Sequence, residues 1–339
     1  METPDSQESP KPKPRRRSRA WKISGGLVGL YALLLVAGEF RIKKGNIYRV
    51  DALLGTHVFI KHHFDTEFYA KNYELIDGIP HVIDHESGKR YPTRRNFEDG
   101  FENADSIHDL IGLERWMQFT VQSPSAPTVP DYNALRKRIL NDGADFIDNL
   151  LTPHGEQVHS GTRALKAYSV LPTSGMSTCK AALHRSLFHF VKGDDVWFSG
   201  WFYFEQVGEY NTLMDLESTW VPGHPGMRIV LQKGLLSFQL AKWEPKRSYR
   251  QSNDTRTKMP TQQWVQITSR LHLREDDTGI VQLWQDGKLL IDERGQTLPF
   301  AGAVYDDFEI GLSAHSKGKG PALLYVDDVS IGDQPIAIK

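Results

Sequence analysis

Alternating apolar and polar residues divide the C-terminal half of the chain into short strands. Residues 264–273 and 279–286 alternate in this way, and Gln285-Asp286-Gly287-Lys288 has the signature of a type I′ hairpin turn leading into 288–292. Two more strands are expected over 308–312 and 323–331. Turn residues recur every 8 to 12 positions with no helical period between them. The pattern predicts an antiparallel all-β sandwich.

One compact helix is predicted within this β pattern, over residues 131–141. Asp131 suits the N-cap, Leu135 and Ile139 share an apolar face, and Gly143 follows the last turn. The preceding segment is harder to interpret, with a small hairpin expected around Glu86-Ser87-Gly88. We therefore assign the sandwich to residues 113–337 and treat 41–112 as a poorly defined extracytoplasmic segment.

The N-terminal residues have a different composition. Residues 1–22 are rich in Pro, Ser, Lys and Arg and are predicted to form a disordered, basic cytoplasmic tail. The uncharged run from Ile23 to Gly38 follows, and we expect residues 23–40 to form a transmembrane anchor in the lipid bilayer. Flanking cations favour an extracytoplasmic C-terminal domain. The alternative is a cleaved signal peptide, which would make the protein secreted or periplasmic.

Composition excludes several classes of protein. The 339 residues carry a net charge of -1, which indicates no partner, and the single cysteine, Cys179, rules out an internal disulfide framework. Phosphate-binding loops, a Gly-x-Ser-x-Gly motif and paired cysteines are missing from the sequence, so we expect no nucleic acid partner, no cofactor and no transition-metal site. Structural calcium remains a candidate, because three Asp pairs offer hard oxygen ligands. These pairs are Asp194-Asp195, Asp306-Asp307 and Asp327-Asp328.

Several motifs together suggest a family. The segment VHSGTRALKAYS begins at Val158, an aromatic strand WFSGWFYFE follows a Lys/Arg-containing one, and the hairpin sequence GIVQLWQDGK precedes a closing YVDDV. This order resembles the concanavalin A-like jelly-roll polysaccharide lyases of the heparin lyase I and glucuronan lyase type, over about residues 155 to 335. The resemblance implies a jelly-roll sandwich and β-elimination of an acidic polysaccharide.

The chain departs from this family at positions where the resemblance implies catalytic residues. Asp215 and Glu217 stand where those lyases carry Gln-x-His, and they share one face of the strand because its period is two. Ser313 stands where they carry a catalytic tyrosine. We take Asp215, Glu217, Tyr249 and His184 as candidate catalytic residues. His189 and His315 are further candidate bases.

A cation-rich stretch runs from Arg228 to Lys258, with eight Lys and Arg residues against Glu244 and Asp254. Elimination requires cations that neutralise a uronate carboxylate, so this stretch is a candidate groove for an acidic glycan. The alternative is an exposed charged surface that favours solubility. The candidate substrate-binding residues are Arg185, Arg228, Lys242, Trp243 and Arg250.

Two classes of function remain after these observations. The chain is predicted to be a membrane-anchored polysaccharide lyase-like protein that acts on or binds a uronate polymer, with its catalytic activity open. The alternative is a non-catalytic glycan-binding or envelope-structural module. A laminarinase-type hydrolase is disfavoured, because Leu213 occupies the position of the first glutamate in Glu-x-Asp-x-Glu.

Overall fold

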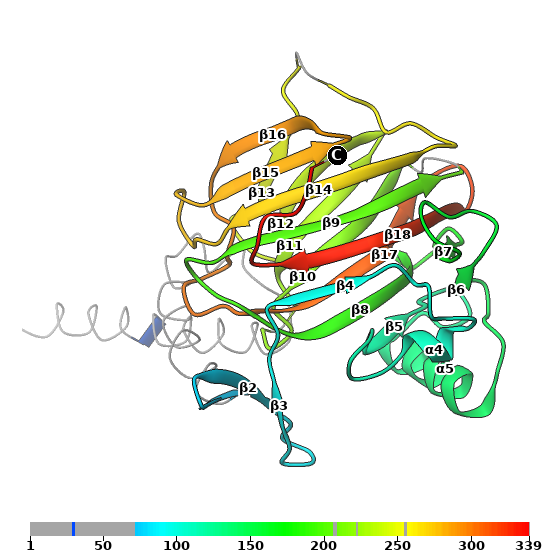
Figure 1. The fold of residues 1–339 in the computed structure, drawn as a ribbon, viewed down its shortest axis with the longest axis horizontal. Helices are drawn as coiled ribbons and strands as arrows, with labels where there is room; N and C mark the ends of the chain where they lie inside the picture. The colour runs from blue at the N-terminus through cyan, green and yellow to red at the C-terminus, as the bar shows by residue number, and fades with distance from the viewer. Residues whose placement is uncertain (1–28, 31–71, 206–208, 222, 254–255, 339) are drawn as a thin grey trace, which may run out of the picture.

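Two large antiparallel sheets lie face to face in the computed structural model (Figure 1). The structure describes residues 29–30, 72–205, 209–221, 223–253 and 256–338. The all-β sandwich predicted from the alternating pattern is therefore confirmed. The strands expected at 264–273, 279–286, 288–292, 308–312 and 323–331 are all present, with ends that differ by a few residues.

The first sheet has seven strands, which come from widely separated parts of the chain. Its hydrogen-bonded order is β13-β12-β11-β10-β17-β8-β5. The bounds in that order are Arg247–Arg250, Leu235–Ala241, Gly226–Gln232, Tyr210–Glu217, Tyr305–Lys317, Cys179–Phe190 and Gln118–Thr120. The order shows that residues distant in sequence become neighbours across this sheet.

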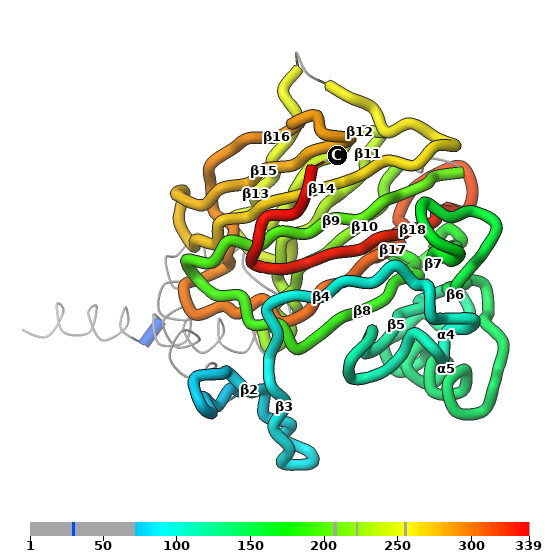
Figure 2. Tube along the Cα trace, in the orientation of Figure 1, coloured from blue at the N-terminus to red at the C-terminus, as the bar shows by residue number. Residues whose placement is uncertain are grey.

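The second sheet follows the order β16-β15-β14-β9-β18-β7-β6, with β4 paired to β18. The bounds in that order are Lys288–Arg294, Ile280–Gln285, Trp264–His272, Asp195–Phe204, Ala322–Gly332, Ala164–Ser169 and Leu150–His154, with β4 at Asn96–Asp99. Asp286 and Gly287 both have positive φ, 47° and 74°, as the predicted hairpin turn requires. Figure 2 shows the chain after β18 running back over this sheet, where Gln266 Nε2 donates to the Ala337 carbonyl at 3.1 Å.

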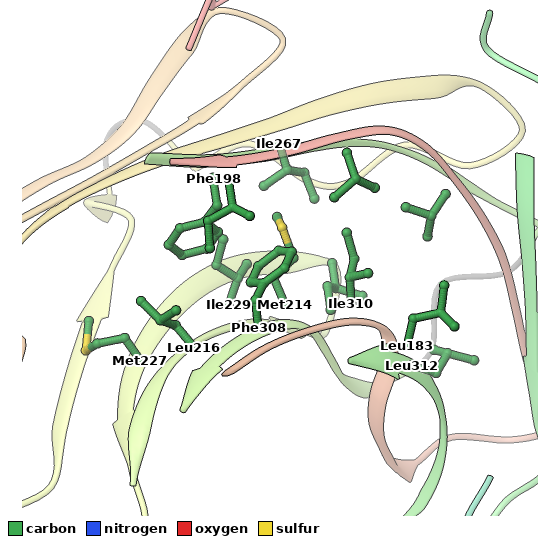
Figure 3. Close-up of a cluster of buried hydrophobic side chains, with 14 of the residues drawn as sticks. Leu183, Phe198, Met214, Leu216, Met227, Ile229, Ile267, Phe308, Ile310 and Leu312 are labelled. Carbon is green, nitrogen blue, oxygen red and sulfur yellow. The ribbon is translucent and has the colours of Figure 1, made fainter. Parts of the chain in front are cut away.

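The core lies between the two sheets and takes one side chain in two from each strand. Figure 3 shows Met214, Ile310 and Phe308 of the first sheet opposite Phe198 and Ile267 of the second. These side chains are fully buried. Because apolar residues alternate with polar ones on β10 and β17, burial of the apolar set turns the intervening polar residues to the opposite face of the sheet.

Smaller elements decorate the sandwich. Helix α5 spans Val129–Asp142 and ends at Gly143 with φ 65°, while α4 spans Ile107–Leu110. Asp131 is not the N-cap predicted from the sequence, because Thr128 takes that position and Asp131 accepts the Thr128 backbone N–H at 3.1 Å. A separate three-stranded sheet consists of β1 to β3, which span Tyr73–Ile76, Ile79–Ile83 and Arg90–Pro92.

The predicted membrane anchor lies almost entirely outside the described residues. Of residues 23–40, only 29 and 30 are described. Within the part of the chain that the structure describes, no helix combines the length and apolar character needed to cross a bilayer.

Candidate functional site

A row of polar side chains crosses all seven strands of the first sheet on the face opposite the core. Backbone register aligns neighbouring members directly across each pair of strands. Core residues such as Met214, Leu216, Phe308 and Ile310 flank the members in sequence, and strand alternation therefore turns the row outward. We call this set the polar row; its members are Gln118, His184, Glu309, Asp215, Arg228, Gln239 and Ser248.

Three carboxylates converge at the centre of the polar row. Oxygen atoms of Asp215, Glu217 and Glu309 lie within 4.8 Å of one another, and all three side chains are buried. Like charges at this separation would repel strongly in a medium of low dielectric. The cluster therefore requires positive charges at close range.

Two cations on strands β11 and β8, and a third directly after β12, supply that charge. Arg228 Nη2 lies 3.0 Å from Asp215 Oδ2 and 3.9 Å from Glu217 Oε1. Lys180 Nζ lies 3.3 Å from Glu309, and Lys242, which directly follows β12, donates to Glu217. Each carboxylate of the cluster thus contacts at least one cation.

The three carboxyl groups differ in their protonation behaviour. Burial raises the pKa of Asp215 to about 7, although Arg228 opposes the shift. Burial also disfavours the charged form of Glu217, but Lys242 and Lys180 outweigh it and lower its pKa. For Glu309, Lys180 and His184 likewise outweigh burial, so its pKa lies well below the usual range. Asp215 is therefore the member that exchanges a proton near neutral pH.

His184 is held in its charged form. Its Nδ1 lies 2.9 Å from Asp307 Oδ2, and its Nε2 lies 3.3 Å from Glu309 Oε1 and 2.9 Å from Thr120 Oγ1. Burial opposes the positive charge, but Glu309 and Asp307 outweigh it and raise the pKa of His184 to about 10. An imidazolium cannot accept a proton, so His184 is not the base that the sequence suggested.

A second histidine lies at the rim of the cluster. His224, in the turn between β10 and β11, has its Nδ1 3.8 Å from Glu217 Oε2, and its side chain is 52% exposed. Partial burial of the ring lowers the pKa of His224 despite the nearby Glu217 charge. A neutral imidazole is therefore present at neutral pH beside the acid and cation cluster, where it can accept a proton.

One tyrosine hydroxyl reaches this region. The Tyr210 hydroxyl, from the start of β10, donates to Gln239 Oε1 at 3.3 Å and so lies beside the polar row. Tyr132, from helix α5, packs against the hydrophobic core, and burial raises its pKa. The Tyr210 phenol provides a proton donor in a site where Ser313 stands at the position of the resembling family's tyrosine, and the Ser313 hydroxyl donates to Glu309 at 2.9 Å.

Three of the residues proposed from sequence do not reach the polar row. Tyr249 is buried against the core, and its hydroxyl donates to the Gln296 carbonyl at 2.7 Å. Trp243 is 7% exposed, and its ring lies 5.4 Å from that of Phe300, so it offers no face for stacking on a sugar. Arg185 is fully buried and donates to the Leu113 carbonyl at 2.8 Å, on the face opposite His184. These assignments were wrong because the local sequence does not show which side chains of a strand, or of the loop after it, pack into the core.

The other two candidate bases are also displaced from the row. His189 packs edge-on to Tyr73 with ring centroids 5.1 Å apart. His315 is buried, and its Nδ1 is 3.1 Å from the Ser169 carbonyl oxygen of the opposite sheet. Neither imidazole contacts the carboxylate cluster.

The cation-rich stretch divides between two places. Arg228 and Lys242 contact the carboxylate cluster. Arg250 is exposed on β13, on the same face as Ser248, and its Nε donates to the Ser248 hydroxyl at 3.3 Å. Arg247 instead pairs with Asp277 at 3.3 Å. The predicted groove is therefore only partly assembled from this stretch.

Metal ions can be considered at two kinds of position. The cluster of Asp215, Glu217 and Glu309 has carboxylate spacing that fits an ion, but a divalent ion there would compete with the cations already present. The Asp pairs considered for calcium form other contacts: Asp327 accepts the His159 backbone N–H at 2.9 Å, and Asp306 accepts that of Thr219 at 2.8 Å. Structural calcium stays a prediction from the sequence.

The candidate residues predicted from the sequence did not include Lys180, Glu309, His224 and Tyr210. A signal was available for the first two, because Asp307-Phe308-Glu309-Ile310 alternates in phase with Asp215-Leu216-Glu217. Lys180 lies four positions before His184, which places both on one face of β8. Contact between β8 and β17 depends on long-range register, which these local patterns do not reveal.

Comparison with known proteins gives a matching family and several similar solved structures. The family described as polysaccharide lyase matches residues 156–330, just over half of the chain. Among solved structures, an endo-β-1,4-glucuronan lyase from the fungus Trichoderma reesei is 15% identical, with 65% of this chain and 96% of that chain covered and a TM-score of 0.45. The cellulose-induced protein Cip1 is 13% identical, with 72% and 100% covered and a TM-score of 0.47. Alginate lyase Aly36B is 9% identical, with 73% and 99% covered and a TM-score of 0.42. No curated protein matches the sequence.

Proposed function

The chain belongs to the polysaccharide lyase family, and from this premise we propose that its polar row binds an acidic polysaccharide and cleaves it by β-elimination at a uronate unit. One observation carries the proposal: a neutral imidazole, His224, and two cations, Arg228 and Lys242, meet at Glu217 on the outward face of the sheet. Elimination needs a base that accepts the C5 proton and cations that neutralise the uronate carboxylate, and both must lie at the same place.

The chemistry assigns a role to each group. Elimination breaks the bond between C4 and the leaving oxygen, forms a C4–C5 double bond, and transfers the C5 proton to a base. His224 is the proposed base, and Glu217 beside it stabilises the imidazolium that results. The Tyr210 hydroxyl is the proposed proton donor to the leaving oxygen, since it lies beside the row at Gln239.

The charge of the cluster suits an anionic substrate when Asp215 is protonated. Four carboxylates, Asp215, Glu217, Asp307 and Glu309, face four cations. The four cations are Lys180, His184, Arg228 and Lys242. The net charge is zero with all groups ionised and +1 with Asp215 protonated, and the pKa of Asp215 is about 7. The substrate carboxylate then takes the place of the Asp215 charge beside Arg228, and protonated Asp215 can donate to it.

A non-catalytic glycan-binding module is the second candidate, and one observation favours it. Lys180, His184 and Arg228 each already lie within 3.3 Å of a protein carboxylate. A substrate carboxylate must therefore compete with Glu309, Asp307 and Asp215 for these cations. Because the cations are already neutralised by protein carboxylates, this face can be stable without catalysing a reaction.

Incubation of the purified protein with polyglucuronate, alginate and neutral dextran distinguishes the two candidates. We expect a rise in the ultraviolet absorbance of unsaturated uronate with at least one acidic polymer and no rise with dextran. Binding of the acidic polymers without any rise would support the non-catalytic module. Absence of both binding and product would refute both candidates.

We also propose that residues 23–40 anchor the protein in a membrane with the sandwich outside the cytoplasm. The support is the uncharged run from Ile23 to Gly38 and the cations that flank it. A reporter fused after residue 60 should be extracytoplasmic, and the intact protein should retain Ile23 to Gly38. A mature N-terminus at Glu39 would replace the anchor with a cleaved signal.

A further inference from the structure

An open groove of about 380 Å³ lies near the β11–β12 turn. Lys233 occupies that turn, Arg250 comes from the edge strand β13, and Arg256 from the loop that follows. Gln251 ties this loop to β12, because its Nε2 donates to the Leu236 carbonyl at 3.2 Å and its Oε1 accepts the Thr257 N–H at 2.8 Å. The groove is therefore bordered by cations, and the Gln251 side chain connects its loop to β12.

The cations of this groove differ from those of the polar row in their pairing. All three are exposed, and within the described residues none has a carboxylate oxygen within ion-pair distance. Arg250 Nε contacts only the Ser248 hydroxyl, and Arg256 Nη2 contacts Asn253 Oδ1 at 2.6 Å. An anionic ligand would thus meet available guanidinium and ammonium groups here without displacing a protein acid.

The groove is continuous with the polar row along the sheet. Gln239 and Ser248 of the row are paired across β12 and β13, and the next pair on the same face, two residues along, is Ser237 and Arg250. Two residues of a strand span about 7 Å. A polysaccharide that extends along the row past Gln239 and Ser248 therefore comes close to Arg250.

We propose that this groove is an outlying subsite that binds the carboxylate of a neighbouring uronate unit, so that affinity increases with chain length. The inference rests on the proposed function, because the row must hold the same polymer. It narrows the substrate class to polymers with successive negative charges. Neutral chains, and polymers with a single isolated uronate, would gain nothing from Lys233 and Arg250.

The test compares affinities for short and long oligoglucuronates in the full-length protein. Lys233→Gln with Arg250→Gln should weaken binding of a long oligomer by about tenfold, with a change below about twofold for the disaccharide. The loss should shrink at high salt, because screening already weakens these contacts. Lys137→Gln with Arg138→Gln, on the exposed face of α5, is the matched control and should leave both affinities unchanged.

The results separate this inference from the proposed elimination. Equal losses in the groove variant and the control, or equal losses for short and long oligomers, would overturn the subsite. Wild-type protein that binds long and short oligomers equally would also overturn it. Affinity that increases with oligomer length in the wild type, and no longer does so in the groove variant, would support the subsite even if no unsaturated product formed. The lack of product would then refute the proposed elimination alone.

Discussion

Each sheet of the sandwich has an outer face, and the two outer faces are covered by different kinds of side chain. On the seven-stranded sheet, Glu309 and Asp215 are 0% and 1% exposed within a network of ion pairs. On the eight-stranded sheet, Trp197 stacks on Trp284 with ring centroids 5.8 Å apart, and the Arg270 pair with Asp195 is partly exposed. Aromatic packing and partly exposed ion pairs cover much of this second face, and its one fully buried carboxylate among the described residues, Asp327, is held by the His159 and Ser160 backbone N–H groups and not by a buried ion-pair network.

The comparison shows that a sheet of this sandwich can be covered without a network of buried ion pairs such as that of the polar row. Burying four acids together with His184, beside three partly exposed cations, incurs a desolvation penalty that their mutual attraction offsets only in part. Strongly shifted pKa values beside specific charge partners are concentrated at functional sites. The contrast favours a functional role for the polar row.

The largest expected effect concerns the stability of the two faces. Lys180→Met leaves Glu309 buried without its lysine and should lower the free energy of unfolding by about 3 kcal/mol or more. Arg270→Met on the other face removes an exposed pair and should cost about 1 kcal/mol or less. Urea denaturation measures both. Equal losses would mean that the two faces do not differ energetically.

Replacement of the proposed base comes next in size. His224→Gln should lower the rate of uronate elimination by about a hundredfold or more, since the amide cannot accept the C5 proton. Polymer affinity should change little, because the cations of the cluster remain. Steady-state kinetics and a binding titration provide the two readouts. Unchanged turnover in this variant would remove His224 from the mechanism.

The dependence of the unfolding free energy on pH tests whether the pKa of Asp215 is shifted within the carboxylate cluster. The pKa of Asp215 is raised from 3.8 to about 7 in the folded protein, so its proton is bound more tightly in the folded than in the unfolded chain. This contribution to stability is complete below pH of about 4 and is lost as the pH rises towards 7, with a slope of up to about 1.4 kcal/mol per pH unit. Asp215→Asn should remove that part of the slope between these limits.

Asp306 is a useful comparison for this measurement, because burial raises its pKa to about 7 as well, outside the carboxylate cluster. The contribution of Asp306 to the pH dependence of the unfolding free energy should persist in the Asp215→Asn variant. A pH profile of unfolding that is identical in wild type and Asp215→Asn would show that Asp215 titrates normally.

A smaller effect is expected from the exposed end of the network. Lys242 is 37% exposed at its side chain and pairs with Glu217. Lys242→Ala should weaken binding of polyglucuronate by about tenfold, because one charge-assisted contact is lost. Isothermal titration at low and high salt measures it. A loss that does not depend on salt would mean that Lys242 acts through folding rather than through charge.

Local sequence patterns predicted the strands but not the site. Asp286-Gly287 specified the hairpin because its backbone conformation is a local property. The polar row instead depends on register between β5, β8 and β17, which come from distant parts of the chain. Asp215 and Glu217 were found because they stand where the resembling lyases carry Gln-x-His, and alternation placed both on one face. Trp243 and Tyr249 were misplaced because a charged stretch does not reveal which aromatic residues pack inward.

The hydrolase alternative illustrates the same limit. Leu213, at the position of the first glutamate, is fully buried in the core next to a register shift between Thr212 and Met214. A carboxylate there would point into the sandwich rather than toward the polar row. Local sequence already disfavoured this activity, and the packing supplies the physical reason.

Mass spectrometry of the products from polyglucuronate tests the central claim most directly. Elimination produces oligomers with an unsaturated uronate at the new non-reducing end, each lighter by one water molecule than the hydrolysis product of the same length. We expect wild-type protein to release these unsaturated oligomers and His224→Gln to release far fewer. Saturated products from wild type, or intact polymer under conditions where it binds, would contradict the account.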